Sequence, residues 1–283
     1  MSKRRGRCCL CGQECELSFE HIPPRAAFNS DPVKPVKGSE FLKDQHLNND
    51  SRMPWETRGL KYENQQQGMG KFSLCTSCNN NTGSWYGADY IKFARTMHVA
   101  LQKGFTAEEN AIQVYEVYPL RIIKQILSMF CSINNPDNEN LDEIRSFVLD
   151  KDAVGLDKSK YKLCMYFTKS TYVKYSGYSV LILHSEMGDS VVGLSELTAY
   201  PFGFILYFDP PEGRNYQGFD ITGFAEVGYD SCVTVEMPLD IREVNDFFPE
   251  QYRSREEIRK CFAENMRLKE ENTTQHNECE TDN

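Results

Sequence analysis

Two pairs of cysteines constrain this chain more than any other feature of its sequence. Cys8 and Cys11 are separated by two residues and followed by Gly12, and Cys75 and Cys78 have the same spacing. Two such pairs can supply the four tetrahedral thiolate ligands of a zinc ion. The glycine after the first pair lets main-chain amides turn toward sulfur. The spacing therefore predicts a structural zinc site formed by these four cysteines.

The number and positions of the other cysteines predict free thiols and not disulfides. The chain has 11 cysteines, an odd number, and no apolar stretch follows its basic start. We therefore expect neither a disulfide framework nor a secretory signal, and we predict a cytoplasmic protein. No apolar run reaches the roughly 18 residues of a membrane span, so no membrane partner is expected. Cys9 and Cys15 are spare thiols beside the first pair. Four single cysteines with apolar neighbours are expected in the core: Cys131, Cys164, Cys232 and Cys261.

Charge is distributed unevenly along the chain, whose net charge is −9. Residues 1–103 contain 15 Lys and Arg against 10 Asp and Glu, whereas residues 104–283 contain 17 against 31. A nucleic-acid partner is therefore compatible with the N-terminal third and not broadly with the rest. Several basic residues near the cysteine pairs can contact phosphates without reading bases, although an ordinary solvated surface accounts for them equally well: Arg4, Arg5, Arg7, Arg25, Lys34 and Lys37.

The pattern of apolar residues predicts an α+β protein of two domains. A chain of 283 residues, 40% of them apolar, is long enough for two cores. The first domain is expected over residues 1–103, with a long polar insertion at residues 25–71. A domain of helices and antiparallel strands is expected over residues 104–271, followed by a disordered acidic tail over residues 272–283.

Periodicity and turn residues place the individual elements. Helices are expected from Pro119, which suits a first helical turn, near residues 141–149, and from Ser254, where Glu257 completes a capping box. Apolar residues at helical spacing predict the core face of a further helix: Tyr86, Tyr90, Ala94, Met97 and Leu101. Runs rich in Tyr, Val, Ile and Phe predict strands: Lys162 to Phe167, Val173 to Leu183, Phe202 to Phe208 and Ser231 to Val235.

Any chemistry must lie outside the zinc site, since four thiolates leave the ion no open position. Between the cysteine pairs, Glu20 stands directly before His21 at the end of a predicted short strand, Leu17 to His21. After the second pair, residues 79–83 read Asn-Asn-Asn-Thr-Gly and are expected to open a helix, with Asn79 as its N-cap the alternative to a ligand. Carboxylate and amide oxygens suit a hard divalent cation, and a neutral imidazole can remove a proton from water.

This arrangement resembles the HNH endonuclease family, which has a ββα-metal fold. Members combine a cysteine pair, an acidic residue before a histidine at a strand end, and a second pair followed by His or Asn, with Gly a few residues on. Residues 8–87 contain these parts in that order. The resemblance implies phosphodiester hydrolysis with His21 as the general base. It also implies that Glu20 and Asn79 bind a catalytic divalent cation, magnesium or manganese, with Asn80 and Asn81 as competitors for the role of Asn79.

One position departs from the family pattern. Many HNH enzymes carry a middle Asn about five residues before the second pair, where it orients the catalytic histidine. Gly70 occupies that place here, and Asn64 lies further upstream as a candidate substitute. The departure bears on the orientation of His21 rather than on its presence.

The resemblance also implies a partner, which is nucleic acid, with DNA expected in preference to RNA. Nucleases with appended domains often serve defence against phage or mobile DNA. Residues 104–271 resemble no family that we recognise, and they can bind a protein or ligand that regulates the nuclease. The alternative is a zinc-stapled module that binds nucleic acid or protein without catalysis, with Glu20 and His21 as remnants. The missing Asn favours this alternative, and the retained acid–histidine pair opposes it.

Three other histidines and a tryptophan have ordinary structural interpretations. His46 is expected on the surface of the polar insertion, and His184 at a strand end. His98 lies one position off the apolar stripe of its helix and is interpreted as structural. Trp55 is expected to pack, with base stacking as the alternative.

Overall fold

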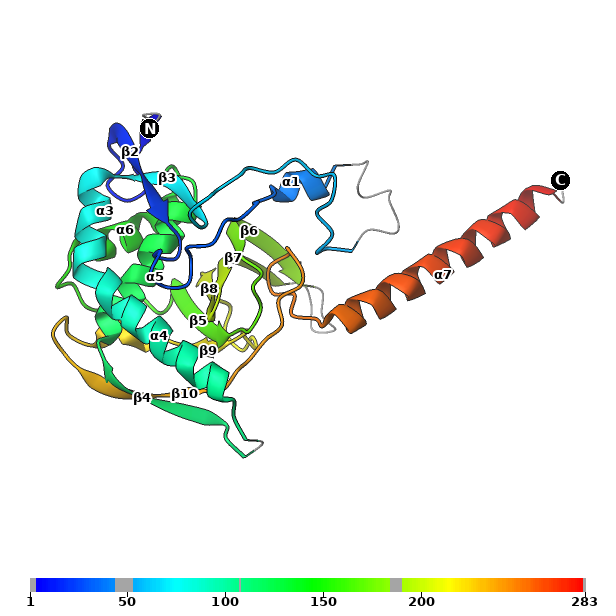
Figure 1. Cartoon of the computed structure of the whole chain (residues 1–283). Helices are drawn as coiled ribbons and strands as arrows, with labels where there is room; N and C mark the ends of the chain where they lie inside the picture. The colour runs from blue at the N-terminus through cyan, green and yellow to red at the C-terminus, as the bar shows by residue number, and fades with distance from the viewer. Residues whose placement is uncertain (1–3, 44–52, 107, 184–189, 282–283) are drawn as a thin grey trace. The chain divides into compact units, whose positions relative to one another are not determined.

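The computed structural model describes residues 4–43, 53–106, 108–183 and 190–281 (Figure 1). The described chain is of mixed α+β type and divides into two compact units. The first contains residues 1–33 and 64–242, and the second contains residues 34–63 and 243–283. The predicted boundary at residue 103 does not coincide with this division.

The cysteine pairs lie at a small antiparallel sheet. Its strands β1 (Arg4–Arg7), β2 (Glu14–His21) and β3 (Gly70–Cys75) follow one another in the sheet in that order. The register pairs Glu20 with Lys71 and His21 with Gly70. A bulge in this ladder follows Ser18, because the register shifts between Ser18 and Phe19.

Three consecutive helical segments follow β3 without a break. They are α3 (Thr76–Thr82), the π-helical turn η1 (Gly83–Gly87) and α4 (Ala88–Lys103). The predicted apolar stripe is confirmed, since all five of its members are buried: Tyr86, Tyr90, Ala94, Met97 and Leu101. The strand pair β2–β3 with α3 after it therefore forms a ββα arrangement.

Helix α5 (Pro119–Ile133) lies at the centre of the first unit, and all of its residues except Arg121 are buried. Its first position is a proline, as predicted. The 3-10 turn η2 (Glu139–Leu141) and helix α6 (Asp142–Leu149) follow and confirm the helix expected near residues 141–149. Burial on almost every side, as seen for α5, is typical of a helix inside a core.

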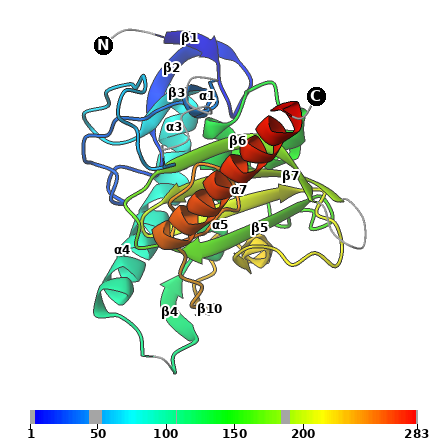
Figure 2. The same cartoon turned by 90° about the vertical axis from the view of Figure 1, so that its right-hand side faces the viewer.

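A second, five-stranded antiparallel sheet packs against α4 and α5 (Figure 2). Its order is β6 (Lys174–Leu183), β7 (Ser190–Ala199), β8 (Phe202–Phe208), β5 (Tyr161–Phe167) and β9 (Phe219–Asp220). Phe93 of α4 stacks on Phe202 at 5.0 Å between ring centroids. One continuous core runs from Cys8 to Met237, which explains why no boundary falls at residue 103.

A separate two-stranded ribbon pairs β4 (Ala111–Val117) with β10 (Val233–Pro238), and the 3-10 turn η3 (Thr222–Glu226) packs against α5. The strand expected near residues 231–235 is thus present, but its partner β4 lies more than 100 residues earlier. Cys131 and Cys164 are buried as predicted. Cys232 and Cys261 are exposed, so the core prediction is wrong for them. Cys232 stands just outside the narrow ribbon, which has too little apolar cover to bury it.

The second unit is small and is built around aromatic contacts. It contains α1 (Gly38–Phe41) and α7 (Arg255–Thr281), and Phe41 stacks on Phe247 at 4.8 Å. Trp55 packs beneath the guanidinium groups of Arg255 and Arg259. The capping box that opens α7 is confirmed, because Ser254 and Glu257 exchange hydrogen bonds.

Helix α7 continues to Thr281, where a disordered tail was predicted for residues 272–283. Residues 255–271 are rich in Glu, Lys, Arg, Met and Leu, which favour a helix and carry it onward. His46 and His184 lie outside the described residues. Among the described residues, no helix combines the length and apolarity needed to cross a lipid bilayer.

Candidate metal centre and active site

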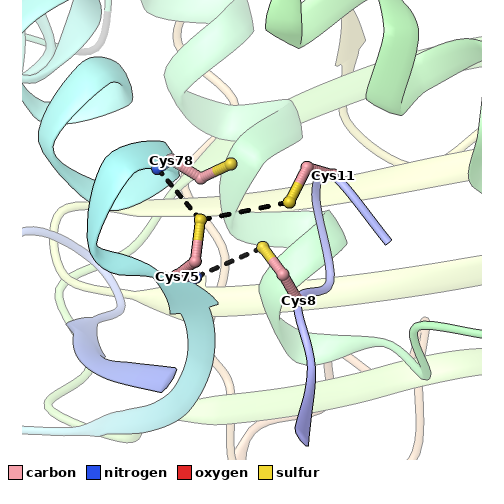
Figure 3. Close-up of side chains that lie close together, drawn as sticks. All are labelled: Cys8, Cys11, Cys75 and Cys78. Carbon is pink, nitrogen blue, oxygen red and sulfur yellow. Dashed lines mark hydrogen bonds between the residues drawn. The ribbon is translucent and has the colours of Figure 1, made fainter. Parts of the chain in front are cut away.

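The four predicted zinc ligands meet in one cluster (Figure 3). The sulfur atoms of Cys8, Cys11, Cys75 and Cys78 all lie within 4.8 Å of one another. Cys8 and Cys78 are buried, and the other two are half-buried. These four thiols can hold a metal ion such as zinc, and a tetrahedral set of this kind is closed to substrate. An ion held there would join the start of the chain to the β3–α3 junction.

Local backbone geometry prepares this cluster. Gly12 has φ of +72°, a value that glycine adopts without strain, and its amide donates to the carbonyl of Cys8. On the other side, Cys75 is the N-cap of α3, and its Sγ accepts a hydrogen bond from the amide of Cys78. The amide of Cys75 donates to Sγ of Cys8 at 3.2 Å.

These donors favour the thiolate form of Cys8, which is the form that binds metal. A hydrogen bond from the Cys78 thiol, helped by main-chain amides, lowers the pKa of Cys8 to about 4. The partner that keeps its proton, Cys78, has a raised pKa for the same reason. The four thiols therefore form a donor set that fits a zinc ion.

His21, the predicted general base, is held by the main chain. Its Nε2 lies 3.0 Å from the carbonyl oxygen of Gln67. Because a carbonyl only accepts, Nε2 carries the proton and Nδ1 presents its lone pair. Burial lowers the pKa of His21 below its usual 6.5; the Gln67 carbonyl opposes this shift and the charge of Arg25 adds to it. The imidazole is thus neutral at pH 7 with Nδ1 as its basic atom.

The loop that carries Gln67 is fixed by a residue that the sequence analysis missed. Asn29 is buried, and its amide nitrogen donates to the carbonyls of Pro23 and Met69. Its Oδ1 accepts from the amide of Met69 at 2.7 Å. Gly68 has φ of +94°, and a Cβ there would lie 2.0 Å from the carbonyl oxygen of Asn29. No periodic or motif signal marks Asn29, because its partners are main-chain atoms of Pro23 and of Met69, which is 40 residues away.

Asn64, the candidate substitute for the missing middle Asn, does not orient His21, and Gly70 has a role of its own. A Cβ on Gly70 would lie 2.2 Å from the carbonyl oxygen of Glu20, so only glycine lets β3 approach β2 at this point. Asn64 is exposed, and its Oδ1 accepts from the side chain of Gln66. The expected role of Asn64 is therefore filled by the Gln67 carbonyl.

Glu20 lies on the buried face of β2 and is 6% exposed. Burial raises its pKa from the usual 4.5 to about 8. Burial and, to a smaller extent, the charge of Glu20 raise the pKa of Tyr175 on β6. The hydroxyl of Tyr175 donates to the carbonyl of Ile22. Without a nearby cation, the carboxyl of Glu20 is therefore protonated at neutral pH.

Asn79 lies within α3 and not at its N-cap, because the helix begins at Thr76 and the cap is Cys75. The helix thus opens inside the second cysteine pair, earlier than expected. The amide nitrogen of Asn79 donates to Ser18 Oγ at 3.1 Å and to the carbonyl of Phe19 at 3.3 Å. Asn80 is exposed. Of the three asparagines, Asn79 is therefore the one whose side chain is tied to β2.

The three candidate catalytic residues divide between the two faces of β2. Side chains alternate along a strand, so Ser18 and Glu20 share the face that α3 covers with Asn79. His21 shares the other face with Phe19, whose ring centroid is 5.1 Å away. The structure therefore places His21, the last residue of β2, on the face opposite to Glu20 and Asn79.

The basic residues are distributed over both units. Arg7 holds the turn after the first cysteine pair, because it donates to the carbonyl of Gly12, and it also pairs with Asp137. Arg4 lies over the ring of Phe72, and Arg25 is exposed. Lys34 and Lys37 belong to the second unit. Of this set, the charge of Arg25 is the one that acts on His21.

Comparison with protein-family models, with curated proteins and with solved structures finds no match to this chain. The function must therefore be argued from the site itself.

Proposed function

We propose that this chain is a metal-dependent endonuclease that hydrolyses phosphodiester bonds of nucleic acid, with DNA the expected substrate. The observation that carries the proposal is the state of His21, a neutral imidazole whose proton is fixed on Nε2 by the Gln67 carbonyl. It stands at the end of β2, in a ββα arrangement stapled by four cysteines. These are the parts, in the order, of the HNH family that the sequence resembles.

In this proposal, Nδ1 of His21 takes the proton of the attacking water as the water adds to phosphorus. Glu20 and Asn79 would hold a magnesium or manganese ion from the helix-facing side of the strand. Such an ion, when bound, stabilises the negative charge on the phosphate and the leaving oxygen. The cysteine cluster keeps β3 and α3 in place and takes no part in the reaction.

A second function is favoured by one specific observation. The raised pKa of Glu20 leaves its carboxyl neutral at pH 7 in the absence of a cation. A protein that never binds a cation there would be a zinc-stapled module that binds nucleic acid or another protein without cutting. In such a module, the neutral carboxyl of Glu20 would be a buried structural group and not a metal ligand.

The test is cleavage of supercoiled plasmid DNA with magnesium, manganese, nickel or EDTA. His21→Ala is expected to lose cleavage by about 10²–10⁴-fold, the usual contribution of a general base. Glu20→Gln is expected to lose the response to the cation, whereas Glu14→Gln, an exposed carboxylate at the start of β2, serves as the matched control. Binding of the plasmid without cleavage under every condition would support the binding module. Cleavage that persists in His21→Ala would place the active site elsewhere.

A further inference from the structure

Phe28 is a strained, exposed aromatic residue seven positions after His21. Its φ is +64°, a left-handed value that a bulky side chain rarely adopts. The side chain is 42% exposed, so burial of the ring does not compensate for the backbone cost. Strain of this kind persists where the surrounding structure enforces it, and it is concentrated at functional sites.

The surrounding structure does enforce this position. The amide of Ala27 donates to the carbonyl of Pro24, and the amide of Asn29 donates to that of Arg25, so the segment turns back on itself. The side chain of Asn29 then ties this turn to Pro23 and Met69. Phe28 is therefore held next to the loop that positions His21.

Two further aromatic side chains pack against the ring of Phe28 on the side toward the protein. Phe28 lies 4.6 Å from the ring of His98 on α4, at an interplanar angle of 31°. Tyr200, in the turn between β7 and β8, meets the edge of Phe28 at 5.4 Å and bonds His98 Nδ1 through its hydroxyl at 2.7 Å. His98 and Tyr200 are half-buried, which leaves Phe28 as the outermost ring of the three.

Two exposed arginines stand close to this cluster along the chain. Arg25 lies three residues before Phe28, and its charge acts on His21. Arg95 is exposed on α4, three residues before His98. Aromatic rings beside guanidinium groups are the combination that binds single-stranded nucleic acid, because every base has a face to stack and every nucleotide carries a phosphate.

We propose that Phe28, supported by His98 and Tyr200, is a stacking platform for an unpaired nucleobase. Because Phe28 lies beside the loop that positions His21, a base stacked on it would lie near the proposed general base. In that respect the inference rests on the proposed function. It deepens that function by naming the substrate: a single strand, or the unpaired part of a duplex. A fully paired duplex offers no free base face except at its ends.

The variant Phe28→Gly separates this role from a structural one. Glycine removes the ring and adopts a φ of +64° without strain. If the ring serves folding, the variant melts at a lower temperature than the parent. If the ring serves binding, the melting temperature stays the same or rises while affinity for a single strand falls.

The experiment is fluorescence anisotropy of the zinc-loaded protein without added magnesium or manganese. The probes are labelled oligothymidylate and oligouridylate of about 20 nucleotides, and a blunt duplex of equal length. Phe28→Gly is expected to weaken single-strand binding by about tenfold or more and to leave duplex binding unchanged. Phe28→Trp is expected to retain it. Tyr115→Ala removes an aromatic ring that is 65% exposed on β4 and is the matched control.

Each outcome decides the matter. Absence of oligonucleotide binding, equal binding by Phe28→Gly, or a lowered melting temperature of that variant would overturn the platform. Stronger binding of one oligonucleotide would show whether the site prefers the DNA probe or the RNA probe. Binding that depends on Phe28, combined with no plasmid cleavage, would refute the nuclease and leave the platform standing. Plasmid cleavage without Phe28-dependent binding would refute the platform and leave the nuclease standing.

Discussion

The ring of His21 is bonded through Nε2 to the carbonyl oxygen of Gln67, 46 residues further along the chain. This bond determines which nitrogen of the imidazole can accept a proton. It also makes the chemistry of His21 depend on a loop that contributes no side chain to it. A change in the path of that loop is therefore expected to act on His21 from a distance.

The first prediction concerns Gly68, which follows Gln67. A Cβ at this position would meet the carbonyl oxygen of Asn29 at 2.0 Å, so Gly68→Ala must displace the loop. We expect cleavage by the proposed nuclease to fall about 10²-fold, as for a catalytic group misplaced by about 1 Å. Plasmid cleavage under single-turnover conditions measures the effect.

Gly213→Ala is the control for Gly68→Ala. Gly213 also has a positive φ, of +75°, but its Cβ would have nothing within 4 Å. The two variants share the backbone cost of alanine in the left-handed region, about 1–2 kcal/mol. Equal activity of the two variants would show that the Gln67 carbonyl does not control His21.

The second prediction concerns the pH dependence of stability. The folded pKa of Glu20, about 8, lies above its usual 4.5, so the folded state favours the protonated carboxyl. This contribution is fully present below about pH 4.5 and is lost as pH rises through about 8. Between about pH 6 and about pH 8, the parent should lose about 1.4 kcal/mol per pH unit relative to Glu20→Gln.

Urea unfolding of the zinc-loaded protein without magnesium or manganese measures this slope. Glu14→Gln removes an exposed carboxylate of the same strand and should leave the slope of the parent unchanged. Saturating manganese should flatten the slope of the parent, because a bound cation favours the ionised Glu20. A slope that is the same in Glu20→Gln would assign the titration to another group.

The third prediction concerns the cysteine cluster. The purified protein should hold one zinc ion, and Cys78→Ser should lose it, since removal of one of four thiolates opens the site. Structural zinc binding of this kind is worth about 10 kcal/mol or more at pH 7, so the variant should unfold at a much lower temperature. Elemental analysis and thermal melting measure the two effects. Cys15→Ser, a half-buried thiol outside the cluster, should retain both the metal and the stability.

The parts of the fold that the sequence predicted depend on local patterns. The cysteine spacing predicted the four-thiol cluster because two residues between ligands suffice to turn both toward one ion. The stripe from Tyr86 to Leu101 predicted the buried face of α4 because a helix repeats every 3.6 residues. Similarly, the pair Ser254 and Glu257 predicted the start of α7.

The parts that could not be predicted depend on contacts between distant segments. Residues 34–63 join residues 243–283 in one unit, and no charge or apolar pattern links the two segments. Asn29 and Gln67 act through main-chain atoms, for which the sequence carries no specific signal. His98 was interpreted as structural because its partners, Phe28 and Tyr200, come from two other parts of the chain.

A buried ion pair lies on the face of the five-stranded sheet that is turned away from α5. Lys174 Nζ and Glu196 Oε1 are 2.9 Å apart, and their side chains are 3% and 0% exposed. Tyr166 also donates its hydroxyl to Glu196 Oε1 at 2.9 Å. Such a pair costs desolvation to form, but the loss of one partner leaves the other charge buried.

The fourth prediction follows from this asymmetry. Lys174→Met should lower the free energy of unfolding by about 3–5 kcal/mol, because the charge of Glu196 stays in the interior. The double variant Lys174→Met/Glu196→Gln should recover much of that loss, since it removes both charges from the interior. Lys92→Met breaks a pair with Glu116 of similar length, 2.7 Å, whose members are 52% and 74% exposed, and should cost less than about 1 kcal/mol. Urea unfolding separates these cases, and a loss at Lys174 no larger than that at Lys92 would mean that water reaches Glu196 and replaces its partner.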